Sequence, residues 1–419
     1  MGKQRLIGRR FLLSVVVFAV FNLTNHAENI KINREDIKTV SVRNSEGFMF
    51  PAIINLDTEN TLDINFDILG DNREYLCYRL IHCNKDWQPS SLIESEFLSG
   101  FNEGRIEDYE SSYNTYTHYV NYNLRIPSPD NQILKSGNYL LQIYPENEPE
   151  DAILEIPFNV SENLANISGS VTGKTDKGIN DKYQQLELEI QLQDNIDPFQ
   201  DIYVTVVQNN RPETKRELIH PTGKRGNTVE YKHLPELIFD GSNEYRRFET
   251  VRADYAGMGV DSVRFMDNVW HAWLTLDESR KDRNYVYDQT QHGRFKIDEY
   301  NSNDPDLSAD YVDVHFQLDL PDINGRQIYI DGDFTGHNFN DFNKMIYNPD
   351  KSVFESTIKL KQGSYNYQYV IRDELTKEIK TDLTEGSNYE TVNEYLIRVY
   401  LKKPGDRADR LIGHKIVGI

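Results

Sequence analysis

Short runs in which apolar and polar residues alternate recur along the whole chain, separated by Gly, Pro, Asn and Asp. In the first third of the sequence these runs are ENTLDINFDILG, REYLCYRLIHC, YTHYVNYNLRIP, GNYLLQIYP and AILEIPFNV. Alternation with a period of two is typical of β-strands, and the longer period of an amphipathic helix is hard to find anywhere in the chain. The pattern therefore predicts an all-β protein.

Turn-forming segments divide the runs into three groups. A polar, glycine-rich segment over residues 159–181 follows the first group, and the acidic segment NSNDPDLSAD, residues 301–310, follows the second. The second group contains YQQLELEIQL, DIYVTVVQN, VRFMDNVWHAWLTL and HGRFKIDEY, and the third contains YVDVHFQLDL, QIYIDGDF, SVFESTIKL, GSYNYQYVI and NEYLIRVYL. Roughly seven strands with turns at short, regular spacing are typical of a β-sandwich. The sequence thus predicts three consecutive β-sandwich domains of the immunoglobulin-like type, over residues 28–165, 166–304 and 305–419.

The first 27 residues have the pattern of a secretory signal peptide. MGKQRLIGRR carries four basic residues and no acid, FLLSVVVFAVF is apolar, and Ala27 offers a small residue for cleavage. The apolar run is too short for a membrane anchor, and no cysteine follows it for lipidation. We expect an exported, soluble mature protein that begins near Glu28 and does not insert into a membrane.

The charge of the chain limits its partners. The sequence has 67 acidic against 46 basic side chains, a formal net charge of −21. A surface of this sign repels phosphate backbones and anionic lipid surfaces, so nucleic acid is not an expected partner.

The two cysteines do not predict a redox or catalytic site. Cys77 and Cys83 lie six residues apart in a run that reads as one strand, which would hold them roughly 20 Å apart, too far for a disulfide unless a turn lies between them. We therefore expect two buried thiols. His82 and Cys83 are neighbours, so on a strand their side chains point to opposite faces and cannot form a nucleophile–base pair. Asp86, Trp87 and Pro89 then predict a turn with the indole at the sheet edge.

Other chemical motifs are incomplete. DGDFTGHNFNDF, residues 331–342, begins like a calcium loop with Asp331, Asp333 and Gly336, but its twelfth position is Phe342 rather than a bidentate glutamate. The sequence contains no G-x-S-x-G and no H-E-x-x-H motif. We therefore expect no metal site, no cofactor and no enzymatic activity.

Tyrosine is unusually frequent. The chain has 26 tyrosines, and YESSYNTYTHYVNYN holds several of them within one run. Those that face outward would favour contacts with another protein, because tyrosine buries a large area with little loss of rotamer entropy. The same side chains would also suit stacking on a glycan.

A longer series of motifs carries a family resemblance. HCNKDW, PSSL, EFLSGF, RIEDYESSYNT, YTHY and SGNY are followed by FDGSNEYRRFE, then by TEGSNYETVNEYLIRVY and the ending RLIG. Over essentially the whole mature chain this order resembles the plug-protein family of the type IX secretion system. The resemblance implies a periplasmic, three-domain β protein that occludes the periplasmic mouth of the outer-membrane translocon barrel.

The last expected domain has a resemblance of its own. QIYIDGDFTGHNFN and SVFESTIKLKQGSYNYQYVI are similar to the immunoglobulin-like modules that bind glycogen and starch. Those modules usually place a sugar-stacking tryptophan just after the turn, where this chain has His337 and Phe339. The alternative function is therefore a periplasmic or secreted carbohydrate-binding protein with Phe334, His337 and Phe339 as glycan contacts.

A long loop in the first domain is the expected partner contact. The insert ESEFLSGFNEGRIEDYESSYNT exceeds what a minimal sandwich needs, and loops of this length are commonly functional. We expect Phe97, Phe101, Tyr109 and Tyr113, or some of them, at the surface that meets the translocon. Alternatively, these side chains only fix the insert to its own sheet.

Overall fold

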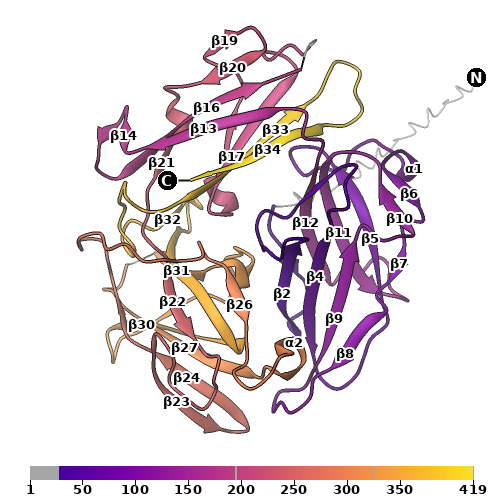
Figure 1. The fold of residues 1–419 in the computed structure, drawn as a ribbon. Coiled ribbons are helices and arrows are strands. Elements are labelled where there is room, and N and C mark those ends of the chain that lie inside the picture. Colours follow the sequence, from indigo (N-terminus) through magenta and orange to yellow (C-terminus); the bar gives the residue numbers. More distant parts are fainter. Residues whose placement is uncertain (1–27, 194–195, 324, 419) are drawn as a thin grey trace, which may run out of the picture.

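The computed structural model describes residues 28–193, 196–323 and 325–418, and it is nearly all β (Figure 1). The prediction of an all-β, multi-domain sandwich protein is confirmed. Three hydrophobic cores define three units, which we call the first, second and third unit. The expected signal peptide lies outside the described residues.

The first unit packs two sheets around one core (Figure 1). One sheet contains β1 (Lys31–Ile32), β3 (Ile53–Asn55), β5 (Leu76–Cys83), β7 (Gly104–Arg105), β11 (Gly137–Pro145) and β12 (Leu154–Ser161). The other contains β2 (Ile37–Asn44), β4 (Leu62–Leu69), β8 (Asp108–Ser111) and β9 (Tyr119–Ile126). The helical turn α1 (Glu94–Phe97) leads into the hairpin of β6 (Leu98–Gly100) and β10 (Asn131–Ile133).

Both faces of β4, in the sheet of β2, β4, β8 and β9, carry buried side chains. Leu62, Ile64, Phe66 and Ile68 point into the core of the first unit. The intervening Asn65 and Asp67 are also buried, at 9% and 0% exposure. Alternate residues of a strand face opposite sides, so the polar face of β4 is covered as well. The third unit covers this face at Asp67, whose carboxylate binds Lys361 and Tyr311.

The second unit consists of two sheets, and one of them contains the last two strands of the chain. Its first sheet contains β13 (Asn166–Thr172), β16 (Tyr183–Gln191), β19 (Gly223–Arg225), β20 (Thr228–Tyr231) and β21 (Ile238–Asp240), with the small hairpin β14 (Lys174–Thr175) and β15 (Gly178–Ile179) beside it. Its second sheet has the order β18 (Arg216–Leu218), β17 (Ile202–Gln208), β33 (Glu394–Leu401) and β34 (Arg410–Gly418). The one-turn 3-10 helices η1 (Pro212–Thr214) and η2 (Pro235–Leu237) connect these strands.

The third unit also consists of two layers. One layer contains β22 (Arg246–Glu249), β26 (Phe295–Ile297), β28 (Arg326–Asp331), β31 (Gly363–Asp373) and β32 (Ile379–Lys380). The other contains β23 (Val260–Met266), β24 (Val269–Leu274), β25 (Asp277–Glu278), β27 (Tyr311–Asp319), β29 (Ile346–Asn348) and β30 (Val353–Lys361). The short helices are α2 (Pro305–Ser308) and η3 (Asp333–Thr335).

The three units are not consecutive along the chain, in contrast to the prediction of three consecutive domains. The whole of β17 pairs with β33, so the final strands belong to the core of the second unit (Figure 1, yellow among magenta). β23, β24 and β26 contribute to the core of the third unit instead of the second. The third unit is therefore inserted between β21 and β33. Alternation reveals a strand but not its partner, which is why the expected limits at 304 and 305 differ from the observed cores.

A buried ion pair joins the first and third units. The Lys361 ammonium lies 2.8 Å from a carboxylate oxygen of Asp67, and both side chains are 0% exposed. Tyr311 donates its hydroxyl to the same oxygen at 2.6 Å, and Asn121 donates to the other at 2.7 Å. Burial raises the pKa of Asp67, while Lys361 and these donors act in the opposite direction. Both carboxylate oxygens of Asp67 therefore have hydrogen-bond partners, and Lys361 also donates to the carbonyl of Asp306 at 2.7 Å.

The first described residues form a strap that touches all three units. Glu28 pairs with Arg398 of β33 and with Lys215 at 3.8 Å, both in the second unit. Asn29 donates to the carbonyl of His337 in the third unit at 2.7 Å. Lys31 and Ile32 then pair with β12 of the first unit. We call residues 28–33 the N-terminal strap.

Replacing Glu28 with glutamine is expected to lower the free energy of unfolding by about 2 kcal/mol, because Arg398 is buried and loses its carboxylate. Chemical denaturation of the purified chain measures this. Glu35→Gln, at an exposed position, is the control and should change stability by less than about 0.5 kcal/mol. Equal effects of the two substitutions would contradict a joining role for the strap.

Candidate functional site

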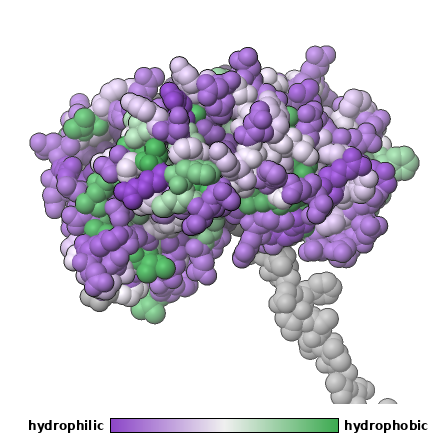
Figure 2. Space-filling model, turned by 90° about the horizontal axis from the view of Figure 1, so that it is seen from below, coloured by the Kyte–Doolittle hydropathy of each residue, from purple (hydrophilic) through white to green (hydrophobic). Residues whose placement is uncertain are grey.

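An aromatic surface lies where the first unit meets the third. It consists of Tyr113, Tyr116, Tyr255, Phe265, Trp270 and Tyr300, which surround a groove of about 580 Å³ or lie beside it. Tyr116, Tyr255 and Tyr300 are 59%, 63% and 68% exposed. In Figure 2, which views the molecule from below, hydrophobic residues gather in several patches on the left half, the side of the third unit.

The β23–β24 hairpin presents two of these rings. Asp267 and Asn268 form its two-residue turn with φ of 50° and 62°, the left-handed conformation that a tight type I′ turn requires at both positions. Phe265 and Trp270 are therefore direct cross-strand partners, with ring centroids 5.0 Å apart. Tyr116 of the first unit adds a third ring, 4.5 Å from Phe265. The cluster thus spans both units.

A buried carboxylate fixes the loop that carries Tyr113 and Tyr116. Asp310, directly after the α2 segment, accepts the backbone N–H of Tyr116 at 2.8 Å and of Thr117 at 3.0 Å. The backbone N–H of Tyr113 donates to the carbonyl of Leu307 at 3.1 Å. The loop between β8 and β9 is therefore held in one conformation by the third unit, so its aromatic side chains are preorganised for contact.

The electrostatics of the aromatic surface are acidic. Arg252 is the one cation among the described residues that line the groove, and it is held by Asp254 at 3.0 and 3.1 Å. Its guanidinium lies between Tyr255 and Tyr300, 5.8 and 5.3 Å from the ring centroids. Glu299 and Asp310 add negative charge. A partner of this surface should therefore be neutral or basic where it makes contact.

The four residues expected to contact a partner do not form one surface. Phe97 is buried at 4% exposure, with its ring 6.0 Å from that of Tyr139, so it is a core residue and not a contact residue. Tyr109 is half-buried against Tyr122, with ring centroids 5.7 Å apart. For these two, the structure corresponds to the alternative in which they fix the insert to its own sheet.

The other two expected contacts are exposed but lie far from each other. Phe101 is 88% exposed and Tyr113 is 45% exposed. Phe101 directly follows β6, at the upper end of the first unit in Figure 1, whereas Tyr113 follows β8 at the lower end. Only Tyr113 belongs to the aromatic surface. The run YESSYNTYTHY signalled the contribution of the first unit, but no local pattern pointed to Tyr255, Phe265, Trp270 or Tyr300.

The expected glycan contacts do not form a stacking platform. His337 is 4% exposed, and its ring nitrogens bond to Asp331 at 2.9 Å and to Asp333 at 2.8 Å. Burial alone would lower the pKa of His337, but the two carboxylates outweigh it and raise the pKa to about 10. The acids of the incomplete calcium loop thus hold an imidazolium, and His337 cannot stack on a sugar.

The two phenylalanines of the same loop are turned toward neighbouring rings. Phe334 packs edge-on against Tyr365, and Phe339 packs edge-on against Tyr329, with centroids 5.4 and 5.6 Å apart. No group of three or more His, Cys, Asp or Glu side chains in the described part of the chain is arranged to hold a metal ion.

The histidine–cysteine neighbours of β5 are structural. Cys77 and Cys83 are free and buried, as expected. Burial raises the pKa of the Cys83 thiol to about 12 and lowers the pKa of His82. The ring of His82 instead bonds to Ser90 Oγ at 2.9 Å and to the carbonyl of Ser136 at 3.0 Å. The thiol stays protonated and has no base, so this pair cannot act as a nucleophile.

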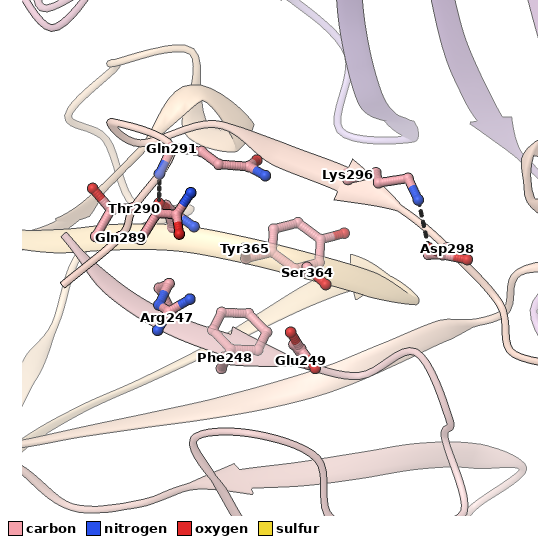
Figure 3. Close-up of a pocket in the computed structure, with 11 residues that line it drawn as sticks. Arg247, Phe248, Glu249, Gln289, Thr290, Gln291, Lys296, Asp298, Ser364 and Tyr365 are labelled. Atoms are coloured by element: carbon pink, nitrogen blue, oxygen red, sulfur yellow. Dashed lines mark hydrogen bonds and ion pairs between the residues drawn. The ribbon is translucent and has the colours of Figure 1, made fainter. Parts of the chain in front are cut away.

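A polar hollow of about 350 Å³ lies over β22 and β31 (Figure 3). Figure 3 shows Lys296 directed at Asp298, at 2.7 Å, and Arg247 at its edge is bound to Asp288 at 2.7 Å. None of its eleven lining residues is a histidine or cysteine. The two cations of the hollow are thus each paired with a carboxylate, and its lining contains neither an imidazole nor a thiol.

Two comparisons with known proteins identify relatives. Residues 37–162 match the family model described as the type 9 secretion system plug protein 1st domain. A crystal structure of a hypothetical protein from Parabacteroides merdae ATCC 43184 is 37% identical, with a TM-score of 0.91 over 93% of this chain and 99% of that one. No curated protein matches the chain.

A further solved structure, the serine-rich repeat adhesion glycoprotein Srr1 from Streptococcus agalactiae, aligns over 91% of this chain and 97% of its own at 9% identity, with a TM-score of 0.12. Among the described residues, no helix has the length and apolar character needed to span a bilayer. The chain belongs to the same family as the Parabacteroides merdae protein, and its residues 37–162 are a first domain of the type 9 secretion system plug proteins.

Proposed function

We propose that this chain is a non-enzymatic, periplasmic component of the type IX secretion system that occludes the periplasmic opening of the outer-membrane translocon barrel through protein–protein contacts. The observation that carries the proposal is the match of residues 37–162 to a plug-protein domain. That domain associates the chain with type IX secretion. Occlusion of the barrel is the additional step of the proposal.

The way the units are joined supports an occluding role. A protein that blocks a channel acts through its shape, so its domains must keep their relative positions while it is bound. Here Lys361 and Asp67 join the first and third units, and the N-terminal strap joins both to the second. Interfaces between domains of one chain are often loose, and buried charge pairs of this kind restrict that movement.

The aromatic surface is the contact that we assign to the translocon. Tyrosine, tryptophan and arginine dominate the binding energy of protein interfaces, and all three occur in this small area. Its rings are surrounded by polar and acidic side chains, a composition that allows a contact to form and be released. The predicted partner surface is neutral or basic, consistent with the charge of the groove.

Affinity isolation of the tagged chain from envelope extracts tests this function. The wild type is expected to recover a large outer-membrane barrel. Combined Tyr116→Ser, Tyr255→Ser and Tyr300→Ser should lower that recovery by about tenfold or more, since single interface tyrosines commonly contribute about 1 kcal/mol or more. All three side chains are more than half exposed, so the variant should keep its stability.

Tyr75→Ser with Tyr287→Ser is the matched control, because these tyrosines are 56% and 63% exposed and are not lining residues of the groove. Unchanged recovery with the triple variant would refute the assigned surface and leave the function standing. Failure of the wild type to recover any barrel would refute the function itself. Retention of the chain on a soluble polysaccharide would then favour the carbohydrate-binding alternative.

A further inference from the structure

A second groove lies between the first and third units, away from the aromatic surface. It has a volume of about 740 Å³ and is lined by the strap and β2 on one side and by β26, β30, β31 and the loop after η3 on the other. Its apolar lining residues are Ile30, Ile32, Ile37, Val40, Phe295, Phe334, Phe342, Leu360 and Tyr365. Sites for small ligands have this size, and they combine apolar walls with a few polar groups that orient the ligand.

A distortion of β2 lies at the wall of this groove. The pairing of β2 with β4 shifts register between Lys38 and Ser41, and Thr39 has a φ of 54°. A positive φ is strained for a β-branched residue, and bulges of this kind re-aim neighbouring side chains next to binding sites. Beside the bulge, the Lys38 ammonium lies 4.8 Å from the ring centroid of Phe342, in the third unit. The bulge therefore accompanies a lysine that reaches across the groove.

Lys38 is a cation without an ion-pair partner among the described residues. The other cations that line the groove are engaged: Arg34 with Asp36 and Glu74, Lys359 with Asp313 at 2.8 Å, and Lys31 with Glu155 at 3.5 Å. Burial lowers the pKa of Lys38, which reflects a partly desolvated ammonium. Glu35 and Asp36 act on Lys38 only through their charge, without an ion pair to it. Apolar side chains beside a partly desolvated ammonium are complementary to a ligand with an apolar body and one negative charge.

The charged side chains of the groove differ in their surroundings. Besides its four cations, the groove is lined by three acids, Glu35, Asp333 and Asp341. Asp333 is bound to His337, and Glu35 and Asp341 are exposed, so water solvates their carboxylates. Lys38 is only partly exposed, so its ammonium gains more than a solvated charge would from a ligand carboxylate.

We propose that this groove binds a small amphipathic carboxylate of the fatty-acid type, with its carboxylate on Lys38 and its alkyl chain along the apolar walls. The ligand would touch the strap, β2 and the third unit at once, so it would also stabilise the arrangement of the units. This inference does not depend on the proposed plugging function.

Isothermal titration of the purified chain with dodecanoate, below its micelle concentration, tests the proposal. We expect one saturable site, and binding of methyl dodecanoate, which lacks the charge, should be weaker by about tenfold or more. Lys38→Met keeps most of the aliphatic stem and removes the charge, and it should weaken dodecanoate binding by a similar factor. The melting temperature of wild type should rise with dodecanoate, and that of the variant should rise less.

Lys359→Met is the matched control, because Lys359 lines the same groove but already has Asp313 as its partner, and it should change the affinity by less than about threefold. Phe342→Ala is a second variant, which leaves Lys38 in place. It should weaken dodecanoate binding by about threefold or more, because the alkyl chain loses its apolar contact with the phenyl ring. Absence of a saturable site, equal binding of the acid and its ester, or equal effects of Lys38→Met and Lys359→Met would overturn the proposal.

Discussion

Lys361→Met is expected to destabilise the chain by about 3–5 kcal/mol, because it leaves the Asp67 carboxylate buried without its counter-ion. Both side chains are fully buried between the first and third units, so water cannot replace the lost ammonium. Chemical denaturation, followed by circular dichroism and by intrinsic fluorescence, measures the loss. Because the isolated carboxylate can be neutralised by a proton, the loss should be smaller at pH 5 than at pH 8.

Lys359→Met is a matched control in the same strand. Lys359 pairs with Asp313 at the same distance of 2.8 Å, but these side chains are 29% and 23% exposed. Its removal should cost less than about 1 kcal/mol. The double variant Asp67→Leu with Lys361→Met removes both charges and should recover much of the stability lost by Lys361→Met alone. If the two single lysine variants were equally stable, the buried pair would not hold the units together.

Glu385→Gln should remove a large part of the acid dependence of stability. Burial alone would raise the pKa of Glu385, but Arg246 and Arg280 outweigh it and lower the pKa to about 2. A carboxyl with a depressed pKa stabilises the folded state above its ordinary value of 4.5, and this stability is lost as the pH falls from about 4.5 to about 2. The shift corresponds to about 3 kcal/mol at neutral pH.

Stability measured from pH 7 to pH 2 tests the role of Glu385. In the wild type the free energy of unfolding should fall in this window, and in Glu385→Gln it should start about 3 kcal/mol lower at pH 7 and fall less steeply. Glu378→Gln is the control, since Glu378 is 58% exposed and pairs with Lys380 at the surface. A wild-type and a Glu385→Gln profile that run parallel would contradict the depressed pKa.

The strands were predictable because the alternation of apolar and polar residues that marks a strand lies within the strand itself. In β9, for example, Tyr122, Leu124 and Ile126 recur at every second position and all face the core. The buried thiols were predictable for the same reason, since the run around Cys77 and Cys83 reads as one strand and is one. The acidic character of the chain likewise required only a count of side chains.

Strand pairing and the contacts between units could not be predicted from local alternation. The run NEYLIRVYL gives β33 its alternation, but nothing within it specifies that β17, nearly 200 residues earlier, is its neighbour. His337 and Phe97 looked like accessible aromatic residues, and both are buried because distant segments cover them. Asp67 reads as an ordinary outward-facing acid of β4 until Lys361 is found opposite it.

By itself, then, the sequence determined the secondary structure, the β-sandwich class, the net charge and the family resemblance, because these depend on side-chain period, composition and the order of motifs. The tertiary structure alone decided that the third unit is inserted into the second, that Tyr116 meets Phe265, and that Lys38 faces an interdomain groove. These features arise where segments far apart in the chain pack together, and no local pattern of hydrophobic and polar residues encodes which surfaces meet.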